Sequence, residues 1–420
     1  MGTHARRVKI RAGMVFIVLS MSLSASSLLA AANKELESEF LKWQSSMQQE
    51  FIDYAAQEQK EYAAYKKEIE KQWQEFSGST KKDWVEYSAD KSTRSKVDFE
   101  IGEIVLEVVI PVEDPDAVAQ TVKAEQENKQ EQAAEAAQKK TEQVAKRKAA
   151  ELARKKKLRK IALDKIKRRL AQIIADKSIN KESPVQQQIK NKSGQVLTEK
   201  NVDKFVEQEL AKKLIIEQKP YIAKDGKIRV VAQVKVAMVP EHLRIRADKF
   251  KDPVETYSRK YNIDSALIFA VIHTESHFNP KARSHIPAYG LMQLVPSSGG
   301  LDAYRFVKGK DQKPSPSYLY DPTNNIELGV AYLKLLSTRE FRKVSNDLTK
   351  KYLIVASYNT GAGNVSRVWE GRRNLKASVQ QINTMEPNAV YQKLIAELPY
   401  EETRKYLKKI VKREKIYQNF

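Results

Sequence analysis

Residues 264–280 read DSALIFAVIHTESHFNP, and this stretch decides the fold of the C-terminal part of the chain. Asp264 suits an N-cap, and the apolar run Leu267–Ile272 predicts a helix that is buried on nearly all sides. Pro280 prevents the helix from continuing. Glu275 stands three positions after Ile272, in the last turn of the predicted helix. Burial disfavours an ionised carboxyl group, so Glu275 is either a salt-bridge partner or a general acid with a raised pKa.

Two histidines, His273 and His277, flank this carboxyl group in the order His-Thr-Glu-Ser-His. A histidine pair at positions i and i+4 of a helix can bind zinc. The zinc-protease motif, however, places Glu immediately after the first His, whereas Glu275 is two positions on and about 200° around the helix. We therefore predict no metal site and no cofactor, and we expect both histidines to be partly exposed polar residues.

The rest of the C-terminal part has the texture of a compact all-helical domain, which we place at residues 249–420. Apolar stretches of helical length alternate there with short loops. Three segments set polar groups among apolar ones: 288–294, which contains Gln293; 321–326, which caps a helix running through Tyr332; and 356–363, which ends a helix at a Gly turn.

Taken together, these segments resemble the soluble lytic transglycosylase domain of glycoside hydrolase family 23, which has a lysozyme-like fold. The resemblance covers about residues 250–415. It rests on four motifs in order: Glu275-Ser276, Ser284 nine residues after the Glu, Gly290-Leu291-Met292-Gln293, and Tyr358-Asn359 with Gly361, where Ser357 replaces the usual Ala. One member of the family is matched further in Ile382–Pro387 and Arg404–Leu407.

The resemblance implies an enzyme, a peptidoglycan lytic transglycosylase. Glu275 would act as the single acid and base, cleaving the bond between N-acetylmuramic acid and N-acetylglucosamine and leaving a 1,6-anhydro end. The residues implied in substrate binding or in orienting Glu275 are Ser284, Met292, Gln293, Tyr332, Tyr358, Asn359 and Tyr406. Two alternatives stay open: a hydrolytic lysozyme-type muramidase, and a non-catalytic cell-wall-binding protein.

The N-terminus has the pattern of a signal peptide, which we place at residues 1–32. Four basic residues precede an apolar stretch from Ala12 to about Leu29, and Ala30-Ala31-Ala32 supplies small residues for cleavage. Five serines dilute the apolar stretch, which disfavours the alternative, an uncleaved membrane anchor. We expect an exported, periplasmic protein. The chain has no Cys, so we expect no Cys-linked lipid anchor, in contrast to the lipoprotein members of the family.

Residues 33–248 predict a small α+β domain. Helical spacing of apolar and aromatic residues runs from Glu35 to Phe76, and β-like segments follow at Val97–Ile101, Ile104–Val112 and Ile228–Met238. We expect these strands to form one sheet. The segment at about 115–215 reads as a basic helical insertion between them. The predicted fold class is therefore mainly α: an all-α lysozyme-like domain preceded by an α+β domain with a long helical insertion.

The charge of the chain is concentrated in this insertion. The 420 residues hold 75 Lys and Arg against 53 Asp and Glu, a net charge of +22. Residues 121–170 alone carry 17 basic and 7 acidic residues. Export excludes chromosomal DNA as the partner, which leaves the acidic cell wall or an anionic membrane surface. The alternative is a solvated spacer. The expected partner of the catalytic domain is the peptidoglycan glycan strand, with no nucleic acid.

Overall fold

The computed structural model describes residues 59–112, 134–178, 182–217, 219–284 and 288–420, together with four isolated positions before residue 59. The chain separates into two compact units, residues 1–62 and 63–420. The predicted signal peptide at 1–32 lies outside the described residues. Within them, no helix is both long enough and apolar enough to span a membrane.

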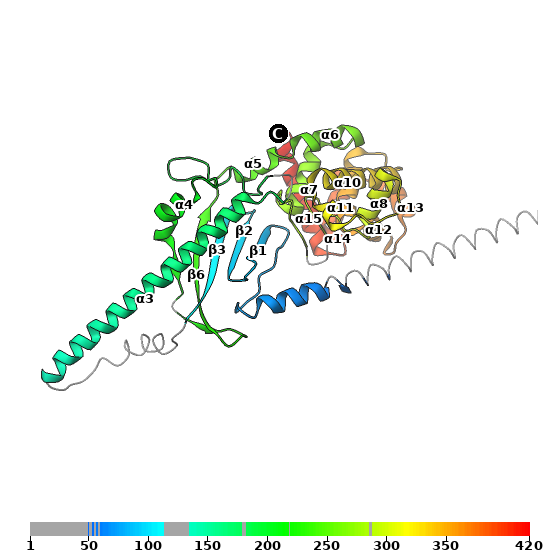
Figure 1. Ribbon diagram of the computed structural model, residues 1–420. Coiled ribbons are helices and arrows are strands. Elements are labelled where there is room, and N and C mark those ends of the chain that lie inside the picture. Colours follow the sequence, from blue (N-terminus) through cyan, green and yellow to red (C-terminus); the bar gives the residue numbers. More distant parts are fainter. Residues whose placement is uncertain are drawn as a thin grey trace, which may run out of the picture. The chain divides into compact units, whose positions relative to one another are not determined.

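The N-terminal part of the second unit is built on an antiparallel sheet (Figure 1). Its strands run in the order β1-β2-β3-β6-β4, and β5 also pairs with β6. Buried residues face each other across the central pair, as in Leu106 opposite Val234 and Val108 opposite Ala232. The expected pairing of strands far apart in sequence is confirmed. The strands are β1 (Asp83–Tyr87), β2 (Thr93–Asp98), β3 (Glu103–Pro111), β4 (Ile215–Ile216), β5 (Tyr221–Ile222) and β6 (Ile228–Ala237).

The basic insertion contains one long helix, α3 (Ala134–Ala175). It lies between β3 and β6 in the sequence, and in space it runs along the sheet (Figure 1). Its C-terminal third carries an apolar stripe, and Ile166, Leu170 and Ile173 are fully buried against the sheet. Most side chains between residues 145 and 160 are exposed. The helix is therefore held at one end by a hydrophobic stripe, whereas its basic stretch faces solvent. The short elements α4 (Val202–Phe205), η1 (Val206–Leu210) and η2 (Ala211–Lys213) follow it.

The predicted aromatic helix is shorter than its spacing indicates. Its described part ends at Ile69, so Trp73 and Phe76 lie beyond the helix. Trp73 is instead buried in a small cluster with Ile69, Tyr87 and Val109, and its indole N–H donates to the Lys91 carbonyl at 2.6 Å. Packing against the sheet and this hydrogen bond outweigh the helical periodicity. The rest of the predicted helix, residues 35–58, lies almost wholly outside the described residues.

Helices make up the C-terminal part, and the described residues after β6 contain no strand (Figure 1). Its centre is α7, whose residues Ala266–Ile272 are all buried and which packs against α6 and α15. The helices are α5 (His242–Asp248), α6 (Lys251–Tyr261), α7 (Ser265–Ser276), α8 (Gly299–Lys308), α9 (Pro316–Tyr320), α10 (Pro322–Leu335), η3 (Leu336–Glu340), α11 (Asp347–Thr360), α12 (Ala362–Glu370), α13 (Leu375–Ile382), α14 (Pro387–Glu397) and α15 (Glu401–Tyr417).

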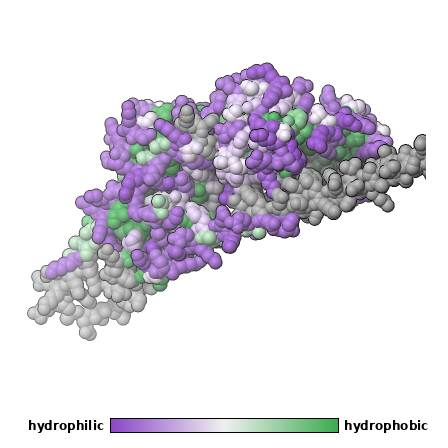
Figure 2. Space-filling model, turned by 45° about the vertical axis from the view of Figure 1, so that its right-hand side comes forward, coloured by the Kyte–Doolittle hydropathy of each residue, from purple (hydrophilic) through white to green (hydrophobic). Residues whose placement is uncertain are grey.

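The fold class is confirmed as mainly α, with an all-helical C-terminal part after an α+β part that contains a long helix. The two parts have separate hydrophobic cores, one over residues 84–238 and the other from Ala247 onward. The predicted domain boundary between residues 248 and 249 stays a prediction. The face shown in Figure 2 is largely hydrophilic, with hydrophobic side chains in separate patches.

Two leucines on α3 provide a test of how this helix is held. Leu170 is fully buried against the sheet, whereas Leu152 is 69% exposed. Leu170→Ala should lower the free energy of unfolding by about 2–5 kcal/mol, because it removes buried apolar surface and leaves a cavity. Leu152→Ala, the same change on the same helix, should cost less than about 0.5 kcal/mol. Urea titration of both variants measures the difference, and equal losses would contradict this packing.

Candidate active site

Glu275 lies in the last turn of α7, and the local sequence explains its position. The Asp264 carboxylate accepts a hydrogen bond from the Ala266 N–H at 2.9 Å and caps the helix start, as predicted. The helix ends where His277 and Phe278 adopt left-handed φ angles of 51° and 60°. The Ser276 hydroxyl donates to the Leu291 carbonyl at 2.7 Å. The carboxyl group is therefore carried by a capped helix that is bonded to the Gly290–Gln293 turn.

Burial governs the ionisation of Glu275, which is only 4% exposed. Desolvation raises its pKa above the ordinary value of 4.5, although the nearby Lys81 ammonium acts to lower it. Tyr406 also acts to lower this pKa, yet its hydroxyl has no partner at hydrogen-bond geometry among the described residues. Tyr406 is a close polar neighbour of Glu275. The predicted environment of a general acid, a buried carboxyl with a raised pKa, is thus present.

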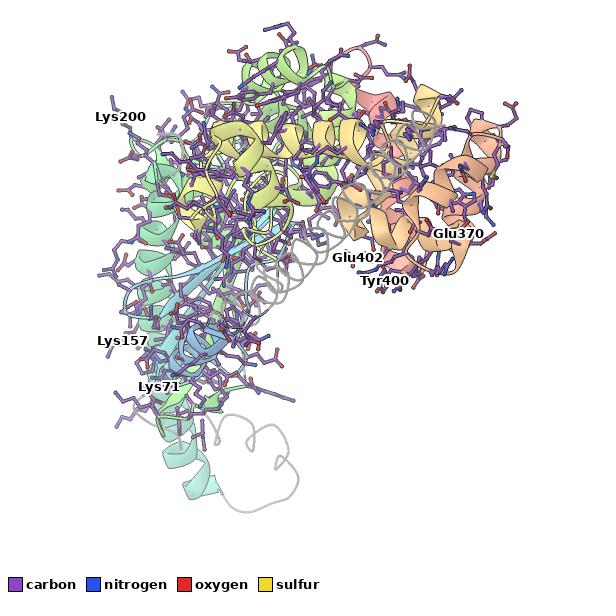
Figure 3. All side chains as sticks on the ribbon, turned by 90° about the vertical axis from the view of Figure 1, so that its right-hand side faces the viewer. Lys71, Lys157, Lys200, Glu370, Tyr400 and Glu402 are labelled. Carbon is purple, nitrogen blue, oxygen red and sulfur yellow. The ribbon has the colours of Figure 1, made fainter. Side chains whose placement is uncertain are left out.

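Lys81 and Glu402 complete the charged groups around Glu275. Lys81 Nζ lies 3.2 Å from Glu275 Oε2 and 3.7 Å from Glu402 Oε1. Glu402 is in the first turn of α15, close to Tyr400, and its side chain is 75% exposed (Figure 3). Lys81 comes from the segment immediately before β1. A residue of the α+β part therefore contacts the candidate acid directly.

The Gly290-Leu291-Met292-Gln293 motif forms a tight turn held by Asn325. The Asn325 side chain accepts from the Met292 N–H at 2.7 Å and donates to the carbonyls of Tyr289 and Leu319, both at 2.8 Å. Gly290 has a φ of 76°, and a Cβ there would lie 2.3 Å from the Leu319 carbonyl oxygen. Only glycine fits this position. The Met292 side chain is fully buried against Gly329. Its predicted role in substrate binding stays a prediction, while the structure gives it a packing role.

Gln293 has an acceptor without a partner. Its side-chain amide nitrogen donates to the carbonyls of Gly290 at 2.9 Å and Ala282 at 3.1 Å. Its Oε1 is buried and has no hydrogen-bond partner among the described residues. The two donated bonds fix the amide, and the backbone φ of 49° is also fixed by the turn. Because an unpaired buried acceptor is costly, Oε1 is a candidate acceptor for a substrate N–H or O–H.

Two of the aromatic residues from the sequence analysis, Tyr332 and Tyr358, lie on α10 and α11. The Tyr358 hydroxyl donates to the Met292 carbonyl at 2.8 Å, and its ring centroid is 5.5 Å from that of Tyr332. The charge of Glu275 helps to raise the pKa of Tyr358, after the larger effect of burial. Tyr332 lines a pocket of about 250 Å³ together with Asp302 and Arg339. Tyr358 therefore lies close to both Glu275 and the Met292–Gln293 turn.

Asn359 and Ser284 have partners of their own. Asn359 Oδ1 accepts from the Thr403 hydroxyl at 2.7 Å, which ties α11 to α15. The Ser284 hydroxyl accepts from the Ala288 N–H at 3.2 Å across residues 285–287, which lie outside the described residues. The contact of Ser284 with Glu275 implied by the resemblance stays a prediction.

The expectation of partly exposed histidines is wrong, because α15 covers both. His273 and His277 are 7% and 9% exposed. The Arg413 guanidinium donates to the His273 carbonyl at 3.1 Å, and the Tyr417 hydroxyl lies 3.0 Å from His273 Nδ1. Burial lowers the pKa of His273 to about 3 and that of His277 to about 4. Within the described residues, no cluster of three or more His, Cys, Asp or Glu could hold a metal ion.

A buried arginine joins the end of α7 to the α+β part. Arg246 on α5 is 1% exposed, and it donates to the His277 carbonyl at 3.0 Å and to the Phe99 carbonyl at 2.6 Å. It also donates to the Gln188 side chain at 2.6 Å. Desolvation lowers the pKa of Arg246 to about 9, so it is a cation at neutral pH. Arg246 therefore connects His277, which follows Glu275-Ser276, to Phe99, which follows β2.

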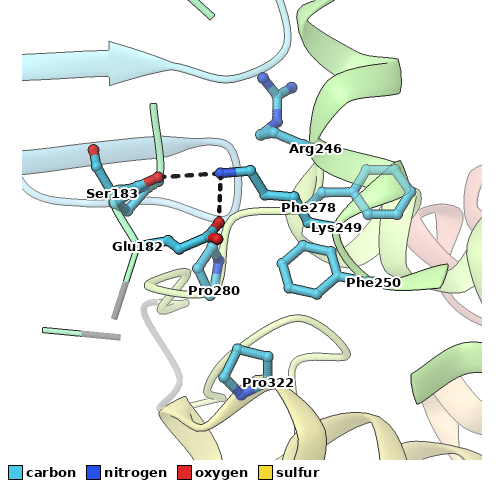
Figure 4. Close-up of a pocket in the computed structure, with 9 residues that line it drawn as sticks. Glu182, Ser183, Arg246, Lys249, Phe250, Phe278, Pro280 and Pro322 are labelled. Carbon is cyan, nitrogen blue, oxygen red and sulfur yellow. Dashed lines mark hydrogen bonds and ion pairs between the residues drawn. The ribbon is translucent and has the colours of Figure 1, made fainter. Parts of the chain in front are cut away.

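Arg246 also lines a pocket of about 210 Å³ behind the end of α7 (Figure 4). The second cation of this pocket, Lys249, is bonded to the Ser183 carbonyl at 3.3 Å and paired with Glu182 at 3.4 Å. Both cations are therefore already engaged by the protein.

Sequence reasoning missed four residues of this site: Lys81, Arg246, Asn325 and Glu402. Asn325 stood in a segment that we read only as a helix cap. No local pattern marks Lys81, which is 194 positions from Glu275. Arg246 is one of two arginines in α5, and nothing in the local sequence distinguishes it as the buried one.

Comparison with known proteins supports the resemblance read from the motifs. Residues 252–381 match the model of the transglycosylase SLT domain family. The chain is 42% identical over 196 residues to membrane-bound lytic murein transglycosylase C of Klebsiella pneumoniae, an alignment that covers 47% of this chain and 54% of that protein. The protein of the same name from Sodalis glossinidius is 41% identical over 191 residues, covering 46% and 53%. The chain spans about half the length of the curated relatives it matches.

Two solved structures are also similar over part of the chain. A lytic transglycosylase Slt from Pseudomonas aeruginosa, solved as an inactive mutant, is 27% identical, covers 40% of this chain and 23% of its own, and has a TM-score of 0.31. The 70 kDa soluble lytic transglycosylase from Escherichia coli is 23% identical, covers 40% and 24%, and also has a TM-score of 0.31.

The raised pKa of Glu275 makes a prediction about stability. The carboxyl group of Glu275 ionises near pH 4.5 in the unfolded chain and at a higher pH in the folded chain. The wild type should therefore lose stability as the pH rises through this interval. Glu275→Gln cannot ionise and should escape the loss. The Tm of Glu275→Gln minus that of the wild type should therefore increase from about pH 4 to pH 7. Calorimetry across this range checks the sign, and a difference that shrinks with pH would contradict the assignment.

Proposed function

We propose that this protein is a peptidoglycan lytic transglycosylase in which Glu275 is the single acid and base. The observation that carries the proposal is a buried carboxyl with a raised pKa at the end of α7, inside a segment that matches the SLT domain family. The similar proteins of known name act on murein, the polymer of the bacterial wall. We infer that this chain acts on the same polymer.

In the proposed reaction, protonated Glu275 gives its proton to the oxygen between N-acetylmuramic acid and N-acetylglucosamine. The bond from this oxygen to the muramoyl anomeric carbon breaks, and N-acetylglucosamine leaves with the proton. Glu275, now a carboxylate, takes the proton of the muramoyl C6 hydroxyl as that oxygen attacks the anomeric carbon. The product is a 1,6-anhydro end. The attacking hydroxyl belongs to the substrate itself, so no second carboxylate and no water are required.

The neighbours of Glu275 suit this reaction. Gln293 Oε1, which has no partner among the described residues, can accept a hydrogen bond from a substrate N-acetyl N–H. Tyr358 and Tyr332 supply aromatic surface beside the Met292–Gln293 turn. Tyr406 is close enough to influence the ionisation of Glu275. Asn359 and Ser284 keep their implied roles as proposals.

A hydrolytic muramidase is the second candidate, because Glu402 is a second carboxylate that shares Lys81 with Glu275. An ordinary glycosidase needs two carboxyl groups that flank the scissile bond. The Glu402 side chain is 75% exposed, so the protein does little to hold its carboxylate in a fixed position beside a substrate. The two candidates differ in what removing Glu402 does.

We expect Glu275→Gln to lower the release of soluble fragments from purified sacculi at least about 100-fold, since the amide cannot transfer the proton. Glu402→Gln should retain most of the release. Turbidity loss and mass spectrometry of the fragments measure both variants. Release above a few per cent in Glu275→Gln would sink the proposal. Loss of release in Glu402→Gln together with hydrolytic products from the wild type would favour the muramidase.

We further propose that the basic stretch of α3 binds the anionic surface of the wall or membrane and that the protein works in the cell envelope after export. The described part of this stretch is solvent-facing, and Lys156, Lys157 and Lys160 are exposed. In Figure 3, Lys157 points away from α3 and Lys200 points outward elsewhere on the α+β part. The curated relatives are named as membrane-bound proteins.

Replacing Lys156, Lys157 and Lys160 with Gln tests this binding without touching the buried stripe of α3. Binding to sacculi or anionic vesicles at low salt should weaken by roughly tenfold or more, and 0.5 M salt should abolish the difference. The matched control replaces Lys192, Lys200 and Lys213, which are exposed on the same α+β part. Equal effects of the two triple variants, or binding that ignores salt, would show that the stretch is a spacer.

A further inference from the structure

The candidate acid of the C-terminal part is paired with a cation from the α+β part. Lys81 Nζ lies 3.2 Å from Glu275 Oε2, across 194 positions of sequence. We propose that Lys81 is a positioning residue for Glu275, and that the α+β part thereby sets the ionisation of the acid as a working component of the active site. This inference rests on the proposed function of Glu275.

The backbone that carries Lys81 is held by hydrogen bonds between the residues before it and β1. The Ser79 hydroxyl donates to the Val85 carbonyl at 3.1 Å and accepts from the Val85 N–H at 2.9 Å. The Thr80 hydroxyl donates to the Asp83 carboxylate at 2.8 Å and accepts from the Asp83 N–H at 3.0 Å. These bonds tie the segment to β1. The approach of Lys81 to Glu275 is therefore built into the sheet and does not depend on the side chain alone.

A second connection closes a ring around the end of α7. The Lys82 carbonyl accepts from the Phe99 N–H at 2.9 Å, and the Phe99 carbonyl accepts from Arg246. Arg246 in turn donates to the His277 carbonyl, two residues after Glu275. The segment with Lys81 and the helix end with Glu275 are thus joined twice, by the ion pair and by Arg246. This double connection holds the ammonium in register with the carboxyl group.

The adjoining contacts reinforce the same junction. The Lys281 ammonium pairs with Asp176, at the end of α3, and lies 4.3 Å from the centre of the Trp84 ring on β1. Lys281 follows α7 by five residues. The segment that follows Glu275 is therefore also anchored to the α+β part.

The charges around the pair show what Lys81 does. Groups that face Glu275 are Lys81 from the α+β part, Tyr358 from α11, and Glu402 and Tyr406 from α15. Lys81 supplies the positive charge among them, and its attraction for the carboxylate opposes the effect of burial. Desolvation acts to lower the pKa of Lys81, but its contacts with Glu275 and Glu402 outweigh this effect, and the pKa is raised. Lys81 is therefore a cation throughout the neutral range.

Burial raises the pKa of Glu275 and Lys81 acts to lower it. This balance suits a carboxyl group that has two tasks. Glu275 must first be an acid and then a base in the proposed reaction, so its pKa cannot lie far from the working pH in either direction. Glu275 is 4% exposed, whereas the Lys81 side chain is 39% exposed. Burial consequently prevails and the pKa of Glu275 stays raised, while Lys81 limits how far it rises.

The direct test is titration of Glu275 by carbon NMR in full-length protein with labelled glutamate, where Glu275→Gln identifies the resonance. In Lys81→Met the midpoint should move to higher pH by roughly one unit or more, since an opposite charge is lost next to a buried carboxyl. Lys81→Arg keeps the charge and should restore most of the shift. Lys81→Gln serves as a second neutral variant if Lys81→Met does not fold.

Lys82→Met is the matched control, because Lys82 belongs to the same segment but pairs with Glu100 at 2.7 Å. It should leave the Glu275 midpoint in place. A midpoint that is the same in Lys81→Met and Lys82→Met would overturn the proposal, as would a shift in Lys81→Arg as large as that in Lys81→Met.

The pH profile of turnover is the second readout. The alkaline limb of kcat/KM on soluble glycan should move to higher pH in Lys81→Met by the same amount as the NMR midpoint, which a merely structural role would not produce. A profile that stays in place while the wild type is active would contradict the role of Lys81. If the wild type shows no turnover, the proposed function fails, and the NMR titration still decides whether Lys81 sets the ionisation of Glu275.

Discussion

The buried guanidinium of Arg246 is the interaction on which the site depends. It donates to the carbonyl of His277 at the end of α7 and to the carbonyl of Phe99 after β2, and it is almost wholly removed from solvent. A buried cation requires its full set of acceptors, so either partner could be lost only at a large cost. Arg246 thus fixes the end of α7, which carries Glu275, against the α+β part.

Within that frame, opposing electrostatic effects meet at one carboxyl group. Burial at the end of α7 raises the pKa of Glu275, and the Lys81 ammonium acts against it. The turn held by Asn325 places Gln293 and the Met292 carbonyl next to the same helix, through the bond from Ser276 to Leu291. A fold with separate hydrophobic cores for its two parts therefore brings residues of both parts to a single acid.

The sequence predicted what local patterns determine. The apolar run after Asp264 indicated a helix buried on nearly all sides, and the alternation in Ile228–Met238 indicated a strand of a shared sheet. Long-range contacts set the rest. Lys81 meets Glu275 only through the docking of two cores. Arg246 is buried by contacts with residues far away in the sequence, among them Phe99 and Gln188. The histidines beside Glu275 are buried for the same reason, since α15 returns over them from the end of the chain.

In the proposed function, Glu275 works alone and a hydroxyl of the substrate is the nucleophile. Digesting purified sacculi with the wild type in water labelled with heavy oxygen tests it most directly, because hydrolysis must place one water oxygen in each new end. We predict 1,6-anhydro ends without label, detected by mass spectrometry. Reducing ends that carry the heavy oxygen would contradict the account.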